Sequence, residues 1–412
     1  MNIYSTQFDH LENGPERIYS LSVGAPSTYL RQKCAELVQK ATLSLHKSEH
    51  CPNAFQYGAE AGPIAFRSEL AKFLSEHYAD AVDPEDLWTN AGASQGLDFL
   101  GHSFFQAGDL VFVEEPAYFI GLMALRDDLG MKVIGVPSDN DGMIVDELEK
   151  LMIEHSNELK PPTDKKPYSA VVYCVPTFNN PTGSCLSAER CKKLITLLRK
   201  HNMLALCDDV YNLLSFTDGI PPPQRLFACD NKSDPDYKGN VISNGSFSKV
   251  LGPGLRLGWM EVPERARKVL KTSAYARSGG CFNQYLSCVI SVALQEGLVK
   301  EHLLMARKVY RTQLDALCNA LDKHLPGQCS YQKPKGGYFV WVTLPPEVDC
   351  DKLFDICKKE YLVEFNYGSR FCATPGKFKN CIRLNFAFNE PNVIEHCVKQ
   401  IAQALKESFG CQ

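Results

Sequence analysis

The chain has 412 residues, of which 44% are hydrophobic and 22% charged, and its formal net charge is -4. These proportions are ordinary for a globular protein, and the length exceeds what one hydrophobic core usually supports, so we expect two domains. No basic run or basic amphipathic stripe is present, which excludes nucleic acid and anionic membranes as expected partners and favours small molecules.

The N-terminal segment, residues 1–20, has no apolar core and carries acidic residues, so we interpret it as neither a signal peptide nor a transit peptide. No apolar run approaches the ~20 residues that a membrane-spanning helix needs. The 17 cysteines are odd in number, scattered through apolar segments and never spaced C-x-x-C, which favours buried free thiols over disulfides or a metal site. We therefore predict a cytoplasmic protein without a metal.

Short apolar runs alternate with amphipathic stretches between about residues 50 and 300. The runs are apolar on both faces, as in strands buried in a parallel sheet, and they cover residues 109–113, 132–136, 170–174, 203–207 and 241–243. The stretches between them, such as 187–201 with Ser187 as N-cap, are predicted to be covering helices. This alternation predicts an α/β fold in three layers, α/β/α, around a mostly parallel sheet.

The pattern changes after residue 281. A long amphipathic helical region is predicted up to His324, followed by strands at 337–342 and 382–388 and a last helix at 392–409. This order predicts a smaller α+β domain, to which the N-terminal segment contributes. We place the large domain at 46–298 and the small domain at 1–45 and 299–412, with loop-like insertions at 161–167 and 221–239.

Two turn-like motifs stand beside predicted strands and helices. Residues 89–96, TNAGASQG, open the predicted helix 95–105, and a glycine- and serine-rich turn there can present backbone N–H groups to an anion. Residues 176–183, PTFNNPTG, follow the strand 170–174, and Asn180–Pro181 is a candidate for a cis bond. Each motif alone is typical of an ordinary turn, but the second stands where parallel sheets bind ligands.

A pair of aspartates ends the strand 203–207. One carboxylate, from Asp208 or Asp209, could pair with a protonated ring nitrogen of a ligand at this sheet edge, and Tyr211 could reach the same ligand. For one of the two aspartates, capping the start of a helix is the simpler interpretation.

The richest motif covers residues 244–259, NGSFSKVLGPGLRLGW. Small hydroxylated residues and Arg256 suit a phosphate group. Lys249, if kept away from water beside a cation, would have a lowered pKa and could attack an aldehyde. A surface loop with a solvated lysine has the same composition, so this motif alone does not decide between the two.

In order and spacing, these motifs together resemble the pyridoxal 5′-phosphate (PLP) aminotransferases of fold type I, class I/II. The resemblance extends from residues 19–26 to 382–386 and is closest to the 2-aminoadipate/kynurenine and multi-substrate branch, judged by FSKVLGPGLR at 247–256. It implies an enzyme that moves the amino group of an L-amino acid to a 2-oxo acid in a ping-pong cycle between PLP and pyridoxamine phosphate.

The resemblance also implies a role for each matching residue. Lys249 would form the Schiff base with PLP and shuttle the proton, Asp208 would pair with the pyridinium nitrogen, and Asn180 and Tyr211 would hydrogen-bond the phenolic oxygen. Tyr118 would stack on the ring, and the phosphate would be bound by Ala93, Ser94, Ser246, Ser248, Arg256 and, from the partner subunit of a homodimer, Tyr57. Arg383 would bind the substrate α-carboxylate beside Asn180, and Gly24 would close over the substrate.

The chain departs from this branch at residues 277–284, RSGGCFNQ, where relatives tend to carry His-Pro-Ser before Phe-Asn-Gln. The donor therefore stays open among 2-aminoadipate, aromatic, branched-chain and small aliphatic amino acids. Arg277 could meet the distal carboxylate of an acidic substrate, or it could be a solvated residue at a helix end.

Two other activities share these motifs. A C–S lyase or a cyclopropane-forming synthase on the same fold would keep all the cofactor residues. The aminotransferase-like sensor domain of bacterial transcription regulators is disfavoured, because neither a winged-helix segment nor a basic N-terminal region precedes the motifs.

Overall fold

The structure is a computed structural model that describes residues 18–217, 219–280 and 282–411. Residues 1–17, which make up most of the N-terminal segment interpreted above, and Cys281 therefore lie outside the described residues. None of the described helices is both long and apolar enough to cross a membrane.

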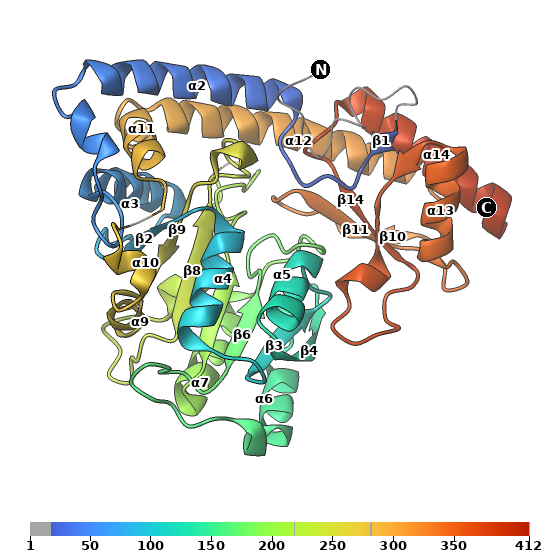
Figure 1. The fold of residues 1–412 in the computed structure, drawn as a ribbon. Coiled ribbons are helices and arrows are strands. Elements are labelled where there is room, and N and C mark those ends of the chain that lie inside the picture. The colour runs from blue at the N-terminus through green and yellow to red at the C-terminus, as the bar shows by residue number, and fades with distance from the viewer. Residues whose placement is uncertain (1–17, 218, 281, 412) are drawn as a thin grey trace.

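A mixed sheet forms the centre of the molecule (Figure 1). Across the sheet, its eight described strands are β2 (Leu87–Asn90), β9 (Gly258–Glu261), β8 (Val241–Ser246), β7 (Leu204–Asp208), β6 (Val171–Cys174), β3 (Leu110–Glu115), β4 (Lys132–Asp139) and β5 (Gly142–Met143). The strands from β8 to β4 are parallel, whereas β9 and β5 are antiparallel to their neighbours. All five predicted strands are confirmed within a few residues.

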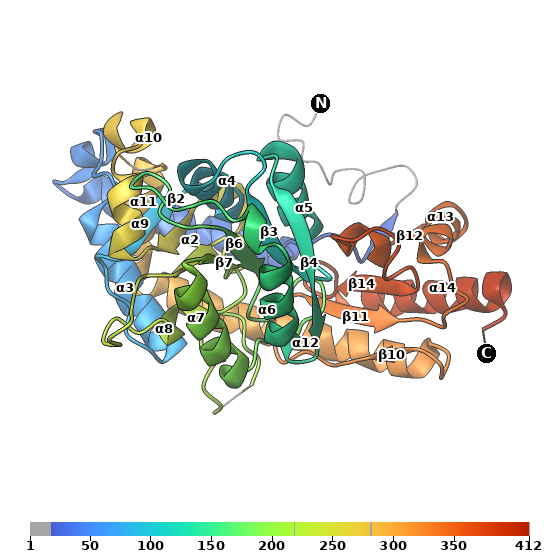
Figure 2. The same ribbon diagram turned by 90° about the horizontal axis from the view of Figure 1, so that it is seen from below.

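Helices cover both faces of this sheet, as Figure 2 shows from below. One layer contains α4 (Ala93–Phe104), α5 (Phe119–Met123) and α9 (Glu264–Leu270), and the other contains α6 (Val145–Glu154), α7 (Ala188–His201) and α8 (Leu226–Cys229). Alternate residues of β3 divide between the two layers, with Val111 and Val113 on the α4 side and Leu110 and Phe112 on the α7 side. The Ser187 hydroxyl caps α7 by accepting from the Arg190 N–H, as predicted.

A third apolar cluster joins the long helices to the C-terminal part of the chain. The helices are α2 (Thr28–Lys47), α3 (Ile64–Tyr78), α11 (Gln284–Gln295) and α12 (Leu298–His324), and α2 lies along α12 in Figure 1. The helical region predicted up to His324 is confirmed, and it is divided into two helices because Gly297 adopts a left-handed φ of 75° and separates α11 from α12.

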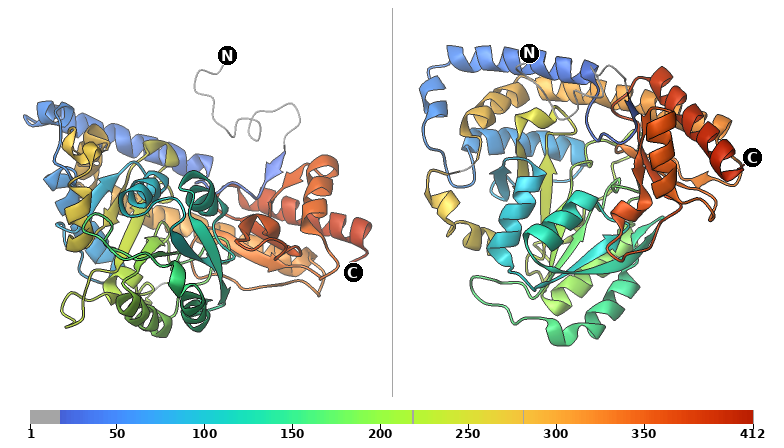
Figure 3. Two further views of the ribbon diagram at one scale, coloured as in Figure 1. Left: turned by 60° about the horizontal axis from the view of Figure 1, so that its bottom comes forward. Right: turned by 45° about the vertical axis from the view of Figure 1, so that its right-hand side comes forward.

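The C-terminal strands form a second, antiparallel sheet (Figure 3). Its order is β10 (Ser330–Tyr331), β11 (Phe339–Thr343), β14 (Cys381–Asn385) and β13 (Asn366–Tyr367), and α13 (Cys350–Glu360) and α14 (Pro391–Phe409) accompany it. Near the N-terminus, β1 (Tyr19–Ser20) pairs in parallel with β12 (Val363–Glu364), which brings the next residues of the chain toward the central sheet. The remaining short helices are η1 (Cys51–Phe55), η2 (Ala124–Asp128), η3 (Ser156–Glu158), η4 (Pro253–Leu255), α10 (Ala274–Arg277) and η5 (Gly368–Phe371).

Candidate active site

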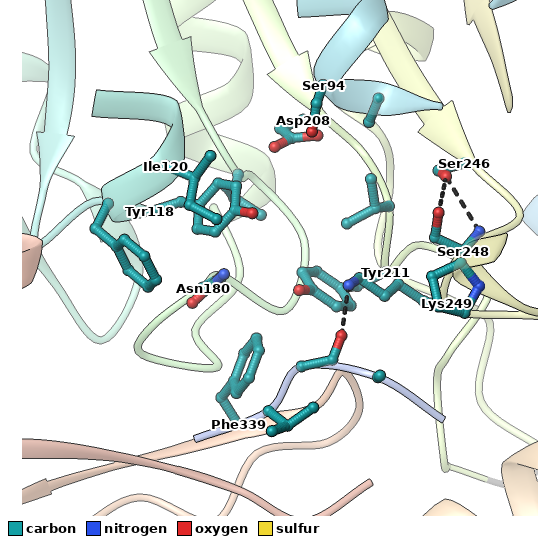
Figure 4. A pocket seen from close by; sticks show the side chains of 18 of the residues that line it. Ser94, Tyr118, Ile120, Asn180, Asp208, Tyr211, Ser246, Ser248, Lys249 and Phe339 are labelled. Atoms are coloured by element: carbon teal, nitrogen blue, oxygen red, sulfur yellow. Dashed lines mark hydrogen bonds between the residues drawn. The ribbon is translucent and has the colours of Figure 1, made fainter. Parts of the chain in front are cut away.

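A cavity of about 600 Å³ lies at the carboxyl ends of the parallel strands. Among the residues that line it are Gly24, Ala93, Ser94, Tyr118, Asn180, Asp208, Tyr211, Ser246, Ser248, Lys249, Arg256 and Arg383. These are all the predicted site residues except Tyr57. Figure 4 shows side chains from several separate strand ends and loops turned toward one space.

Lys249 follows β8 and points its amine into the cavity (Figure 4). The amine donates to the Gly24 carbonyl over 2.6 Å. Burial lowers the pKa of Lys249 to about 8, against the opposing effect of Asp208 and with a further lowering by Arg383 and Arg256. The neutral, nucleophilic form of the amine is therefore a minority at pH 7, but a much larger one than for an ordinary lysine.

Two tyrosines hold the backbone carbonyl of Lys249 by hydrogen bonds. The hydroxyls of Tyr338 and Tyr310 lie 2.7 Å and 3.2 Å from the Lys249 carbonyl oxygen, and 2.7 Å from each other. Because both rings are fully buried, the lysine projects from a rigid support.

Of the two aspartates, Asp208 at the end of β7 is the one that reaches the cavity. Its Oδ2 accepts from the Tyr173 hydroxyl over 3.0 Å, whereas its Oδ1 is buried and has no partner among the described residues. Burial raises the pKa of Asp208 to about 6. A buried acceptor without a donor is costly, so this atom is suited to an N–H group brought by a ligand.

The neighbouring Asp209 lies elsewhere, with its Oδ2 2.5 Å from the Ser243 hydroxyl. The alternative that one of the two aspartates caps a helix is wrong, because the described chain after β7 forms a turn and no helix begins there.

Hydrogen-bond donors for an anion gather beside α4. Ala93 and Ser94 form the first turn of that helix, whose N-terminus attracts negative charge. The Ser246 and Ser248 hydroxyls lie 2.9 Å apart, and Arg256 lines the same end of the cavity. A Cβ atom on Gly92 would lie only 2.8 Å from Arg256 Nη2, so glycine at this position allows the guanidinium to approach the helix N-terminus.

The loop after β6 contributes Asn180, whose Oδ1 accepts from Arg383 Nη1 over 2.9 Å. The predicted cis bond at Asn180–Pro181 is wrong, since Glu115–Pro116 is the cis bond of the described chain. The reversal at the motif comes instead from positive φ angles at Phe178 (51°) and Gly183 (74°).

Arg383 stands on β14, on the opposite side of the cavity from the central sheet. Its guanidinium carbon lies 3.9 Å from the centroid of the Phe339 ring, and its Nη2 donates to the Ser22 carbonyl over 2.6 Å. Burial lowers the pKa of Arg383 to about 10, so it stays charged at neutral pH, and no carboxylate of the described chain pairs with it. This buried cation is therefore available to an anionic ligand.

Two residues that the sequence suggested for the site, Tyr57 and Arg277, do not line this cavity. Tyr57 is 80% exposed and borders a second, shallower hollow with Phe55, Tyr275 and Gly279. Arg277 is exposed at the end of α10.

Several cavity residues escaped the sequence analysis. Phe119, Phe339, Glu364 and Arg370 line the cavity but belong to no motif, and Tyr173, which contacts Asp208 from inside β6, has the pattern of a core residue. Of these residues, Phe119 could have been indicated by its position next to Tyr118 in the sequence. No feature of the sequence around Arg370 indicates that it belongs to the site.

The sequence matches a known family along nearly its whole length. The family model described as aminotransferase class I and II matches residues 16–401. The chain belongs to the class I and II aminotransferase family. This confirms the resemblance inferred from the motifs.

Individual relatives of this aminotransferase span nearly its whole length. It is 31% identical over 388 residues to the 2-aminoadipate transaminase of Thermus thermophilus, covering 93% of this chain and 88% of that one. It is 29% identical over 397 residues to aromatic-amino-acid aminotransferase 1 of Thermococcus litoralis, covering 95% and 89%. The solved structure of the Pyrococcus horikoshii kynurenine aminotransferase in complex with PMP aligns with a TM-score of 0.83 at 31% identity, over 99% and 96%.

The protein is therefore a transaminating enzyme of fold type I with PLP as its cofactor, and these findings do not favour the lyase alternative. The residues present fit that cofactor. The unpartnered Asp208 Oδ1 suits a ring N–H group, the donors beside α4 suit a phosphate, and a partly neutral lysine amine stands between them.

Proposed function

We propose that the cavity is the PLP site of an aminotransferase that accepts 2-aminoadipate, aromatic or other donors in a broad range and uses a 2-oxo acid as acceptor. One observation carries the proposal. A single cavity contains the amine of Lys249, the carboxylate of Asp208 with its unpartnered Oδ1, and the uncompensated cation of Arg383.

The proposed cofactor contacts follow from position. Asp208 would accept from the ring nitrogen, Asn180 and Tyr211 would contact the phenolic oxygen, and Tyr118 would cover the ring. The phosphate would be bound by Ala93, Ser94, Ser246, Ser248 and Arg256. When bound, PLP supplies a ring that withdraws electrons from the substrate.

The chain's own side chains would then bind the substrate and move its proton. Arg383 would bind the α-carboxylate in a bidentate pair, supported by Asn180 and the Ser22 carbonyl. Lys249 Nζ, with a pKa of about 8, can accept a proton and return it near neutral pH. The segment at Gly24 covers this amine and would limit the access of water.

The walls of the cavity support a mixed range of donors. Phe119, Ile120 and Phe339 offer apolar surface for aromatic or aliphatic side chains, and Asn366 and Arg370 offer polar groups. The names of the relatives, which include aromatic-amino-acid, kynurenine and 2-aminoadipate aminotransferases, agree with such a range.

We also propose that the protein is a cytoplasmic homodimer. The exposed apolar side chains of Phe55, Tyr57 and Tyr275 are the support for a subunit contact, because such surface is usually covered in solution. Tyr57 would reach the phosphate in the partner's cavity.

The function is tested by a panel of L-amino acids with 2-oxoglutarate as acceptor, in which glutamate formation is measured. We expect turnover with at least one 2-aminoadipate-like or aromatic donor, and parallel lines in double-reciprocal plots. Release of ammonia and pyruvate without amino transfer would instead indicate a lyase and contradict the proposal.

A further inference from the structure

The proposed function leaves one cation of the cavity, Arg370, without an anionic ligand. Arg370 belongs to η5, lines the cavity and is exposed at its edge. Its Nη1 donates to Asn366 Oδ1 over 2.7 Å, and its guanidinium carbon lies 4.3 Å from the centroid of the Phe119 ring. Within the part of the chain that the structure describes, no carboxylate forms an ion pair with it.

The other charges of the cavity are accounted for by neighbours or by the proposed ligands. Lys249 is opposed by Asp208, Arg256 stands in the phosphate cradle, and Arg383 faces the α-carboxylate position.

The other cavity carboxylate, Glu364, is also occupied. It accepts from the hydroxyls of Ser20 and Ser22 over 2.9 Å and 3.1 Å and lies 3.5 Å from Lys358. Among the described residues that line the cavity, Arg370 is thus the positive charge that has neither an ion-pair partner nor a proposed ligand.

Arg370 also lies close to Arg383. Their guanidinium carbons are 4.3 Å and 6.0 Å from the centroid of the same Phe119 ring, so they are within about 10 Å of each other. Like charges at this separation repel each other unless an anion lies between them. Because both guanidinium groups lie beside the Phe119 ring, a dicarboxylic substrate bent against that ring would bring one carboxylate to each of them.

We propose that Arg370 determines specificity for the second carboxylate of five- and six-carbon dicarboxylic amino and oxo acids, while Arg383 binds the first. This inference rests on the proposed function and names a substrate class for the same site. Because Arg370 is exposed, its charge is solvated when a neutral side chain occupies the cavity, which allows apolar donors as well.

The test compares substrates with and without the second carboxylate. For wild type, Arg370→Gln and Arg370→Lys, kcat/KM is measured with a dicarboxylic donor, 2-aminoadipate or glutamate, and with a monocarboxylic donor such as phenylalanine. We expect the dicarboxylic-to-monocarboxylic ratio to fall about 10- to 100-fold in Arg370→Gln, as for loss of a charge-assisted hydrogen bond, and to recover in part in Arg370→Lys.

Two controls separate this role from general damage. Arg126→Gln removes an exposed arginine that pairs with Asp127 outside the cavity, and it should keep the wild-type ratio. Arg383→Gln should lower kcat/KM for both donor classes. If the wild type transaminates but Arg370→Gln keeps its ratio, the inference on Arg370 is overturned and the proposed function stands. If the wild type transfers no amino group from any donor, both are overturned.

Discussion

At the scale of single residues, the site depends on burial acting in opposite directions on two charged groups. Burial disfavours the charged forms, so it lowers the pKa of Lys249 to about 8 and raises that of Asp208 to about 6. Each charge partly offsets the effect of burial on the other. The result is an amine that can take up and release a proton near neutral pH, beside a carboxyl group that is mostly ionised there.

This predicts a pH dependence for cofactor binding. Since only the neutral amine attacks an aldehyde, the rate at which the cofactor-free protein takes up PLP should rise with pH and level off above about pH 8. Stopped-flow absorbance measures this rate. A rate that keeps rising beyond about pH 10, as for an ordinary lysine, would contradict a lowered pKa. Lys249→Ala serves as the control and should not show this phase.

The residues of the cavity differ in how far the sequence could predict them. Lys249, Asp208 and Asn180 follow strands in motifs of recognisable spacing, so their meeting at one sheet edge was predictable. Tyr173 supports Asp208 from inside a buried strand, and nothing distinguishes it there from a core residue. Arg370 enters the cavity only through the tertiary packing of a short helical turn, which no local pattern encodes.

At the scale of elements, the loop that carries Asn180 is braced by a buried acid of β3. Glu114 Oε1 accepts from the Val175 N–H over 2.5 Å and from Asn179 Nδ2 over 2.7 Å. Burial raises the pKa of Glu114 to about 8, which makes it predominantly neutral at pH 7. The brace is therefore a neutral carboxyl group that holds the loop at Val175 and Asn179.

Replacing this acid should affect stability according to the atom that is lost. Glu114→Ala would leave two buried N–H groups without an acceptor and should lower the free energy of unfolding by about 3 kcal/mol. Glu114→Gln retains the accepting oxygen and should cost less than about 1 kcal/mol. Urea denaturation measures both values. Equal losses in the two variants would be inconsistent with a neutral Glu114.

The elements themselves were mostly predictable from hydrophobic periodicity, and the misses have physical causes. β2 and β9 are four-residue strands that overlap or adjoin motifs, too short for a clear alternation. α2 was not assigned as a helix, although Leu30, Leu37, Ala41 and Leu45 are buried at helical spacing. The break between α11 and α12 depends on one glycine conformation that the apolar pattern does not reveal.

At the scale of the whole molecule, distant parts of the chain meet at the cavity. The segment after β1 passes beside β12 and β14 and provides the Gly24 carbonyl for Lys249 and the Ser22 carbonyl for Arg383. The layered α/β fold was predictable because its strands are apolar throughout, whereas the place of Gly24 at the site was indicated by the family resemblance alone. The division into domains at 46–298, and at 1–45 with 299–412, remains a prediction.

The proposed homodimer gives a prediction at this scale. Sedimentation should give twice the mass of the chain, and Tyr57→Phe should raise the dissociation constant for PLP about 10-fold by removing one hydrogen bond to the phosphate. Ile153→Ala, which changes an exposed apolar residue away from the hollow around Tyr57, is the control. A monomeric protein whose affinity for PLP is the same before and after the Tyr57→Phe substitution would exclude this role.

The central claim, that Lys249 bears the cofactor, is tested most directly by reducing the purified holoenzyme with borohydride and mapping its peptides by mass spectrometry. Reduction makes a lysine–cofactor linkage permanent, so the account predicts a phosphopyridoxyl group on Lys249 and on no other lysine. Recovery of the unmodified Lys249 peptide, with the group on a different lysine, would contradict the account.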